Sequence, residues 1–193
     1  RTAEHTFSYR ETDVLRIARL GAELAASRRG VLTVVGKASG IPTVSALWRS
    51  CAERAAEERG VRCVHLDVDH AAFKLVAEPR AFDVLLASNL FGDVLGDLAA
   101  VFQGSRGNSF SASYAESGWA IYQTNHGAAY DLAGTDRAHP AGQSFSVAMM
   151  LRESFGLPDE AAAIEEAVEE VWRAGWRTCD VPGPPGSSVI GTR

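Results

Sequence analysis

The sequence predicts an α/β fold in which a partly parallel sheet is flanked by helices. Short apolar runs rich in β-branched residues alternate with longer segments whose apolar residues recur at helical spacing. The connections between these segments are short, as in sheets built from repeated strand–helix units. The 193 residues, 46% of them hydrophobic and 22% charged, suffice for one large domain or two small ones.

Four helices and three strands are expected in the first half of the chain. Thr12 and Asn89 are suitable N-caps for the first and fourth helices, and Gly30 and Gly60 end the first two. Pro79 breaks the chain before the third strand. The helices are expected at about 12–29, 44–59, 69–77 and 89–100, and the strands at 31–35, 61–68 and 82–87.

The second half of the chain is expected to be less regular. Residues 103–118 are rich in Gly and Ser and are expected to form a loop. A short apolar piece at 119–122 and a further loop follow it, and two more helices are expected at 140–155 and 158–174. The last helix carries a row of glutamates, which is most often a solvated surface.

Composition and charge exclude several classes of partner. The formal net charge of −5 leaves no basic surface for nucleic acid. The longest apolar runs are too short to span a membrane, and the first residues do not have the pattern of a secretory leader. The three cysteines Cys51, Cys63 and Cys179 lack metal-ligand spacing and are expected to be reduced thiols in a cytoplasmic protein.

Two carboxylates mark the fourth helix as a candidate metal site. Asp93 and Asp97 are four residues apart, which places both side chains on one face of a helix. Mg²⁺ and Mn²⁺ prefer such oxygen ligands and keep other positions open for water and substrate. The alternative is a pair of solvated aspartates on an early helical turn, where the helix dipole favours them.

Three blocks of sequence resemble the isopropylmalate and isocitrate dehydrogenase family, the metal-dependent β-decarboxylating dehydrogenases. They are NLFGDVLGDLAA, VVGKASG followed by ALWR, and HGAAYDLAG followed by AHP and AMML. Their order and spacing resemble the carboxy-terminal half of the family, closest to its NAD-dependent isopropylmalate and tartrate types. The similarity covers nearly the whole chain.

The resemblance implies an isopropylmalate dehydrogenase-like fold that is incomplete in this chain. Residues 1–103 are expected to form part of the smaller, dimer-forming and metal-binding domain, and residues 104–193 part of the larger, nucleotide-binding domain. In the family, the arginines that hold the substrate carboxylates and a catalytic tyrosine lie in the amino-terminal half, which has no counterpart here. The residues that would identify the hydroxy acid are therefore not in this sequence.

The resemblance also assigns the metal and the base. Asp93 and Asp97 match two metal-binding aspartates, and Asp69 matches a third that reaches the site of the neighbouring subunit, which implies a homodimer with shared active sites. Lys37 matches the catalytic lysine, which also crosses the dimer interface and assists proton removal from the substrate hydroxyl. Without the family context, a loop lysine is most often a solvated surface group, and a lysine base requires surroundings that lower its pKa.

The cofactor is expected to be NAD. His126, Gly127, Ala128 and Ala129 match the loop around the adenosine half of the nucleotide, and His139 stands where an asparagine normally contacts the adenine. Asp131 matches the position that accepts hydrogen bonds from the ribose hydroxyls in NAD-using members, where a carboxylate would repel a 2′-phosphate. As an alternative reading, histidine, glycine and aspartate are common loop formers.

The function that the resemblance implies is NAD-dependent oxidative decarboxylation of a 2-hydroxy acid bearing a 3-carboxylate, with a divalent metal. Candidate substrates resemble 3-isopropylmalate, isocitrate, tartrate or a phosphonate analogue. Gln123, Asn125, Tyr130 and Ser88 depart from the family pattern. The alternatives are therefore a non-catalytic regulatory or assembly subunit, or one half of a split enzyme of the same family.

Overall fold

The computed structural model describes residues 1–183 and 188–191 and divides into two compact units, Arg1–Ala99 and Ala100–Arg193. The predicted nucleotide-binding part of the chain therefore includes six residues, 184–187 and 192–193, that lie outside the described residues. Each unit is built from its own elements around its own packed helices.

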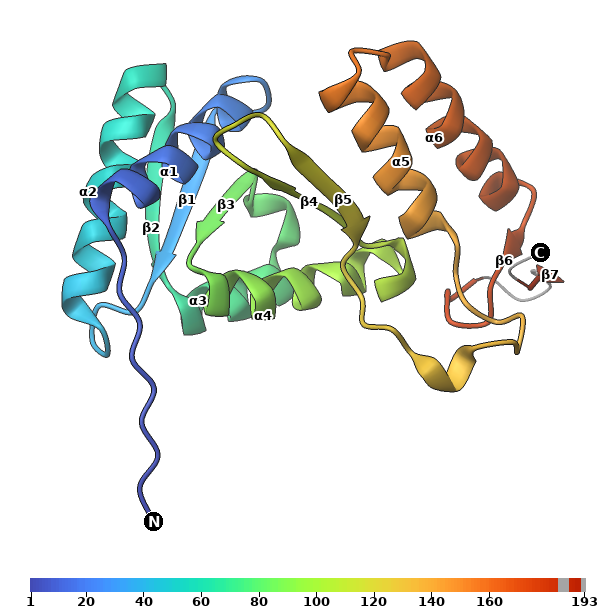
Figure 1. Cartoon of the computed structure of the whole chain (residues 1–193), viewed down its shortest axis with the longest axis horizontal. Coiled ribbons are helices and arrows are strands. Elements are labelled where there is room, and N and C mark those ends of the chain that lie inside the picture. The colour runs from blue at the N-terminus through green and yellow to red at the C-terminus, as the bar shows by residue number, and fades with distance from the viewer. Residues whose placement is uncertain (184–187, 192–193) are drawn as a thin grey trace. The chain divides into compact units, whose positions relative to one another are not determined.

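Unit 1 confirms the predicted α/β fold. It contains a three-stranded sheet of order β2-β1-β3, in which both neighbouring pairs are parallel (Figure 1). In chain order its elements are α1 (Glu11–Ala26), β1 (Val31–Gly36), α2 (Pro42–Arg59), β2 (Arg62–Asp67), α3 (Val68–Ala77), a 3₁₀ turn η1 (Pro79–Ala81), β3 (Val84–Ala87) and α4 (Asn89–Ala100).

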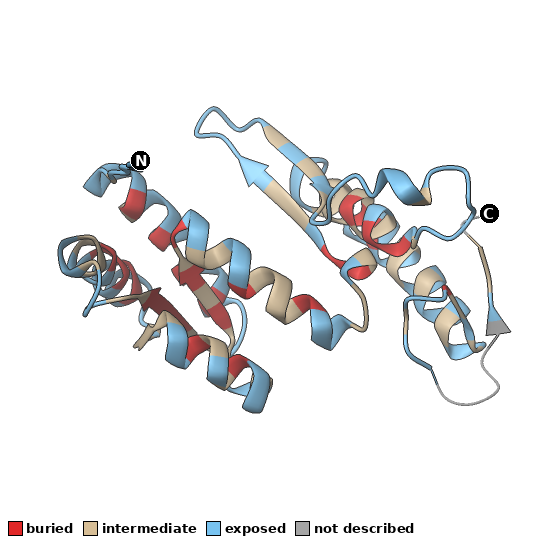
Figure 2. Ribbon diagram, turned by 90° about the horizontal axis from the view of Figure 1, so that it is seen from below, coloured by how far each residue is buried: buried red, intermediate tan, exposed pale blue. Residues whose placement is uncertain are grey.

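Helices cover both faces of this sheet, which explains why β1 is apolar without alternation. Leu32 and Val34 pack with α1 and α2 on one face, whereas Val35 packs with α3 and α4 on the other. Figure 2 shows buried residues gathered where these helices face the sheet. A strand that is buried on both faces does not show the alternation of polar and apolar residues that is typical of a half-exposed strand.

Two of the predicted helix caps are wrong. The first helix begins at Glu11, so Thr12 lies inside it, and no side chain caps its start. In α4, the Gly92 N–H donates to the Ser88 carbonyl oxygen at 2.7 Å. Asn89 is therefore a helical residue, and helical bonding starts one residue before it.

Unit 2 is an antiparallel hairpin covered by helices. The hairpin strands β4 (Phe110–Tyr114) and β5 (Ala120–Thr124) both pack against α5 (Ala141–Ser154), and α6 (Pro158–Arg173) packs on α5. A short parallel pair, β6 (Trp176–Arg177) and β7 (Ser188–Val189), completes the described part of the unit. Three 3₁₀ turns connect these elements: η2 (Val101–Gln103), η3 (Arg106–Asn108) and η4 (Tyr130–Leu132).

The hairpin corrects the prediction of a loop over residues 103–118. The pairs Ser111↔Gln123 and Ala112↔Tyr122 show that small and polar residues occupy much of both strands. Such residues weaken the period-2 apolar pattern by which a strand is identified. Of the serines and glycines in this segment, Ser111 and Ser113 lie in β4, and Ser117 and Gly118 lie in the turn that leads to β5.

No helix in the described part of the chain is long and apolar enough to cross a bilayer. Cys51, Cys63 and Cys179 are all free thiols, as their spacing predicted.

Candidate active site

Lys37 lies at the carboxyl edge of the sheet in unit 1, next to two carboxylates. β1 ends at Gly36 and β2 ends at Asp67, and these two residues are partners in the parallel register. The residues that follow the two strands therefore meet. Lys37 Nζ donates to Asp69 Oδ1 at 2.6 Å and lies 3.5 Å from Asp67 Oδ2. The predicted base and one predicted metal ligand are thus direct neighbours in one chain.

These carboxylates favour the ammonium form of Lys37 within one chain. The hydrogen bond to Asp69, assisted by the charge of Asp67, raises the pKa of Lys37. The same hydrogen bond lowers the pKa of Asp69. A lysine that removes a proton must have its pKa lowered instead. The Lys37–Asp69 pair must therefore separate before Lys37 can act as a base.

The other two predicted metal ligands lie on α4. Asp93 is exposed and Asp97 is partly buried, one helical turn apart, while Leu95 and Leu98 of the same helix face the core. Among the described residues, no three His, Cys, Asp or Glu side chains come close enough to hold a metal ion. A single chain therefore supplies a pair of carboxylates and, elsewhere in the same unit, a third. All three offer the oxygen ligands that Mg²⁺ and Mn²⁺ prefer.

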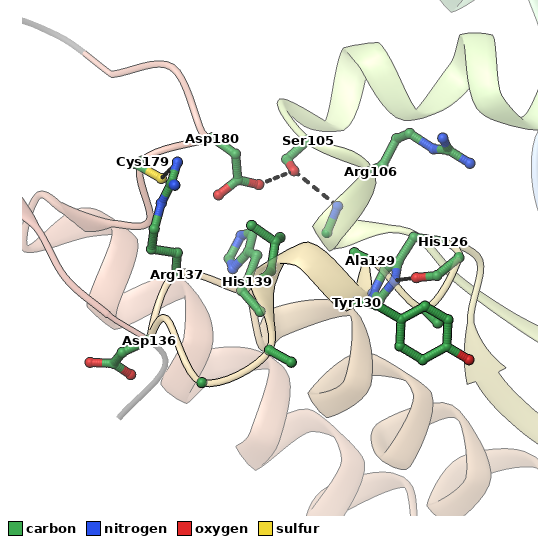
Figure 3. Close-up of a pocket in the computed structure, with 17 residues that line it drawn as sticks. Ser105, Arg106, His126, Ala129, Tyr130, Asp136, Arg137, His139, Cys179 and Asp180 are labelled. Atoms are coloured by element: carbon green, nitrogen blue, oxygen red, sulfur yellow. Dashed lines mark hydrogen bonds between the residues drawn. The ribbon is translucent and has the colours of Figure 1, made fainter.

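Unit 2 contains a cavity of about 730 Å³. Five of the six residues predicted to bind the cofactor line it, namely His126, Gly127, Ala128, Ala129 and His139. Asp131 is exposed and is not among the described residues that line the cavity. In Figure 3, His126 and Tyr130 lie on one side of the cavity, and His139 lies between them and Arg137.

The backbone shapes the walls of this cavity at two positions. Ala129 has a left-handed conformation, with φ 44°, which turns the loop immediately before Tyr130. Gly107 leaves room for His139, because a Cβ atom on Gly107 would lie 2.5 Å from the His139 Cβ. The loop at Ala129 and the imidazole of His139 thereby line one space, together with Gly107 from an earlier segment of the chain.

His139 presents an unpaired imidazole inside the cavity. Its Nδ1 and Nε2 atoms are both buried and have no hydrogen-bond partner within the described structure. Burial lowers the pKa of His139, and the opposing charge of Asp180 is the weaker influence. A neutral imidazole has one donor and one acceptor nitrogen, and a small movement of the ring that exposed them would suit a heteroaromatic ring whose edge offers the complementary groups. The residues present therefore fit an adenine nucleotide.

Sequence reasoning missed several residues of the cavity. Arg137 lies two residues before His139, and its Nη2 is 3.8 Å from Cys179 Sγ. Asp180 accepts a hydrogen bond from the Ser105 hydroxyl. These residues come from three segments far apart in the sequence, so no local pattern groups them. The one local signal is that Arg137 directly precedes the AHP block, which could have identified Arg137 as a cavity residue. Gln123 and Asn125 are exposed on or beside β5 and are not among the described lining residues.

Comparisons with known proteins agree with the resemblance found in the sequence. The family model for isocitrate/isopropylmalate dehydrogenase matches residues 1–191. The 3-isopropylmalate dehydrogenases of Oleidesulfovibrio alaskensis and Synechococcus are 45% and 46% identical to the chain. These matches cover 98% and 100% of this chain but 53% and 50% of the two relatives. The chain thus spans about half the length of the curated relatives it matches.

Two solved structures show the same fold. The crystal structure of isocitrate dehydrogenase from Methylococcus capsulatus has a TM-score of 0.90 and 33% identity, over 98% of this chain and 55% of that one. The apo β-decarboxylating dehydrogenase from Thermococcus kodakarensis has a TM-score of 0.78 and 34% identity, over 91% of this chain and 52% of that one.

Proposed function

Because the chain belongs to the isocitrate/isopropylmalate dehydrogenase family, we propose that its protein catalyses NAD-dependent oxidative decarboxylation of a 2-hydroxy acid bearing a 3-carboxylate. The observation that carries this proposal is the placement of the Lys37–Asp69 pair, 2.6 Å apart, in the same unit as two carboxylates one turn apart on α4. A fold freed from catalysis has no physical need for carboxylates in this pattern.

Asp69, Asp93 and Asp97 would hold a divalent ion such as Mg²⁺ or Mn²⁺. When bound, this ion would acidify the substrate hydroxyl and stabilise the negative charge left when the carboxylate departs as CO₂. Lys37 would then take the hydroxyl proton at Nζ once it has left Asp69 and released its own ammonium proton to solvent. When Asp69 binds the metal, Lys37 would lose the carboxylate that raises its pKa. Metal binding by Asp69 would therefore make Lys37 a better base.

A homodimer with shared sites accounts for the separation of the three carboxylates. In one chain they form no common cluster among the described residues, so a second chain is needed to bring Asp69 to the α4 pair. Both helices concerned expose large apolar side chains, which supports their burial against another surface. These are Phe73 and Val76 on α3, at 72% and 60% exposure, and Leu90 and Val94 on α4, at 64% and 51%.

The cavity in unit 2 would hold the adenosine half of NAD. Its volume of about 730 Å³ lies within the range of ligand sites. The loop residues His126 to Ala129 would enclose the nucleotide, and the unpaired His139 would hydrogen-bond the base. Asp131 would hydrogen-bond the ribose only if the exposed side of η4 faces that sugar.

The test is turnover by the complete protein with Mn²⁺, NAD and each of 3-isopropylmalate, isocitrate and tartrate. Turnover is measured as NADH formation and CO₂ release. We expect one of these substrates to be oxidised. Asp97→Asn should abolish turnover and weaken Mn²⁺ binding by more than about 10-fold, because it removes a ligand rather than a supporting contact. It should leave NAD binding intact.

Glu166→Gln, which changes an exposed carboxylate on α6, is the matched control and should keep full activity. Unchanged Mn²⁺ affinity of Asp97→Asn in calorimetry would remove α4 from the metal site. Binding of NAD and Mn²⁺ without turnover of any hydroxy acid would instead favour the non-catalytic subunit.

A further inference from the structure

Asp67, which sequence comparison did not single out, contacts both the backbone and the side chain of the Lys37 loop. It is the last residue of β2, and its register partner Gly36 is the last residue of β1. Asp67 Oδ1 accepts a hydrogen bond from the Ala38 N–H at 3.1 Å. Its other oxygen, Oδ2, lies 3.5 Å from Lys37 Nζ. One carboxylate therefore fixes the chain after Lys37 and also faces its ammonium group.

The preceding amide is fixed from the other side of the loop. The Lys37 N–H donates to Ser45 Oγ at 3.0 Å, so two successive amides are each bound by a side chain. Gly36 allows this close approach, because a Cβ atom there would lie 3.1 Å from Ser45 Oγ. The start of the Lys37 side chain is thus fixed between α2 and the end of β2.

Asp69 cannot perform the same task while it binds a metal. It is the closer partner of Lys37, at 2.6 Å, but its side chain is 68% exposed, compared with 39% for Asp67. The proposed function requires the Asp69 oxygens at the metal. When they are used there, Asp67 is the remaining carboxylate beside Lys37 among the contacts described.

We propose that Asp67 is a positioning residue for Lys37, holding the loop and directing Nζ while Asp69 serves the metal. This inference rests on the proposed function. It makes Asp67 necessary for the rate of the chemical step and not for binding of metal, substrate or cofactor.

The experiment compares substitutions of two aspartates that contact opposite ends of β1 and its flanking loops, in the complete protein. Asp83 is the matched control, because its Oδ2 accepts the backbone N–H groups of Arg29 and Val31 at 3.0 and 3.1 Å, at the amino end of the strand. It supports the sheet through the same kind of contact but lies at the opposite strand end from Lys37. Any loss common to Asp67→Asn and Asp83→Asn is therefore structural.

We expect Asp67→Ala to lower kcat by about 100-fold at saturating Mn²⁺, NAD and substrate, since small misplacement of a catalytic group can cost that much. KM for substrate should change by less than about threefold. Asp67→Asn keeps an oxygen for the Ala38 N–H and loses the charge, so its kcat should recover part of the loss. Asp83→Asn should lower the melting temperature and leave kcat within about twofold of wild type.

Equal kcat values for Asp67→Ala and Asp83→Asn would overturn the inference, because Asp67 would then be a structural contact only. A loss confined to KM would overturn it as well. Lys37→Ala separates this failure from that of the proposed function. If Lys37→Ala is inactive while Asp67→Ala is active, only the positioning role is lost. If Lys37→Ala is fully active, the proposed mechanism itself is wrong.

Discussion

At the scale of single residues, the fold moves the protonation of two candidate site residues in opposite directions. The carboxylate of Asp69 raises the pKa of Lys37 through a 2.6 Å hydrogen bond. Burial lowers the pKa of His139, whose ring nitrogens have no described partner. The ion pair therefore favours the ammonium form of Lys37, and burial favours the neutral ring of His139.

His139 should make the stability of the protein depend on pH. Its pKa in the folded chain lies below the unfolded value of about 6.5, so the unfolded chain binds more protons in the window just below pH 6.5. The free energy of unfolding should therefore fall as the pH falls through that window, by about 1.4 kcal/mol for each unit of difference between the two pKa values.

Denaturant titrations at about pH 7.5 and about pH 5.5 measure this loss of stability. His139→Asn should remove the part that comes from this residue. Burial also lowers the pKa of His65, so His65 should contribute to the pH dependence of stability in the same direction. The variant His65→Asn measures that contribution separately. Equal pH dependence in wild type and His139→Asn would show that the ring is not buried in solution.

Asp131 offers a second residue-scale prediction, on cofactor choice. Asp131→Lys should shift the preference between NADP and NAD towards NADP by at least about 10-fold, because a repulsive charge becomes an attractive one. The measurement is the ratio of kcat/KM for the two cofactors. An unchanged ratio would mean that Asp131 does not face the ribose, in keeping with its absence from the described cavity wall.

At the scale of elements, close backbone packing determines which small residues are required. Gly142, in the first turn of α5, lies against the turn that precedes β4. A Cβ atom on it would lie 2.6 Å from the Gly107 carbonyl oxygen and 2.8 Å from that of Ser109. Backbone atoms cannot move aside as a flexible side chain does. This contact fixes α5 against the segment from which Gly107 reaches the cavity.

Gly142→Ala should therefore destabilise the protein by about 1–3 kcal/mol, the usual cost of adding volume to a packed site. Gly92→Ala on α4 is the control, because its Cβ would meet the Ala87 Cβ at 3.8 Å, an ordinary contact. That change should be neutral or stabilising, since alanine is the better helix former. Equal melting temperatures for the two variants would show that α5 does not approach the turn so closely.

The elements of unit 1 could be predicted from the sequence because each has an unambiguous local pattern. β1 is a continuous apolar run, and α2 ends at Gly60 in the left-handed conformation expected of a C-terminal glycine. The hairpin β4–β5 could not be predicted in the same way, because serines and small residues hide its alternation. The cavity residues Ser105, Arg137 and Asp180 become neighbours only through tertiary structure, which no local pattern records.

At the scale of the whole molecule, the chemistry is divided between parts of the chain. The candidate base and metal ligands lie in unit 1, and the nucleotide cavity lies in unit 2. Within unit 1, Lys37 pairs with Asp69, and no three described His, Cys, Asp or Glu side chains come close enough to hold a metal ion. In the proposed function a complete metal site combines parts of two chains, so an intact subunit should supply the residues that a variant subunit lacks.

Mixing two inactive variants tests this sharing directly. A Lys37→Ala chain lacks the base and an Asp93→Asn chain lacks a metal ligand, so each should be inactive alone as the complete protein. In a heterodimer with two-fold symmetry, one site receives both lesions and the other receives neither. Random mixing places about half of the chains in heterodimers with half of their sites intact, so activity should return to at most about a quarter of wild type.

The mixture must be compared with each variant alone and with a mixture of Lys37→Ala and Asp69→Asn chains. Lys37 and Asp69 belong to one chain at 2.6 Å, so each heterodimer of this second mixture carries one lesion in each site and should stay inactive. Native mass spectrometry establishes that subunits exchange in both cases. Exchange without recovered activity in the first mixture would place Lys37 at the site of its own subunit and end the shared-site mechanism.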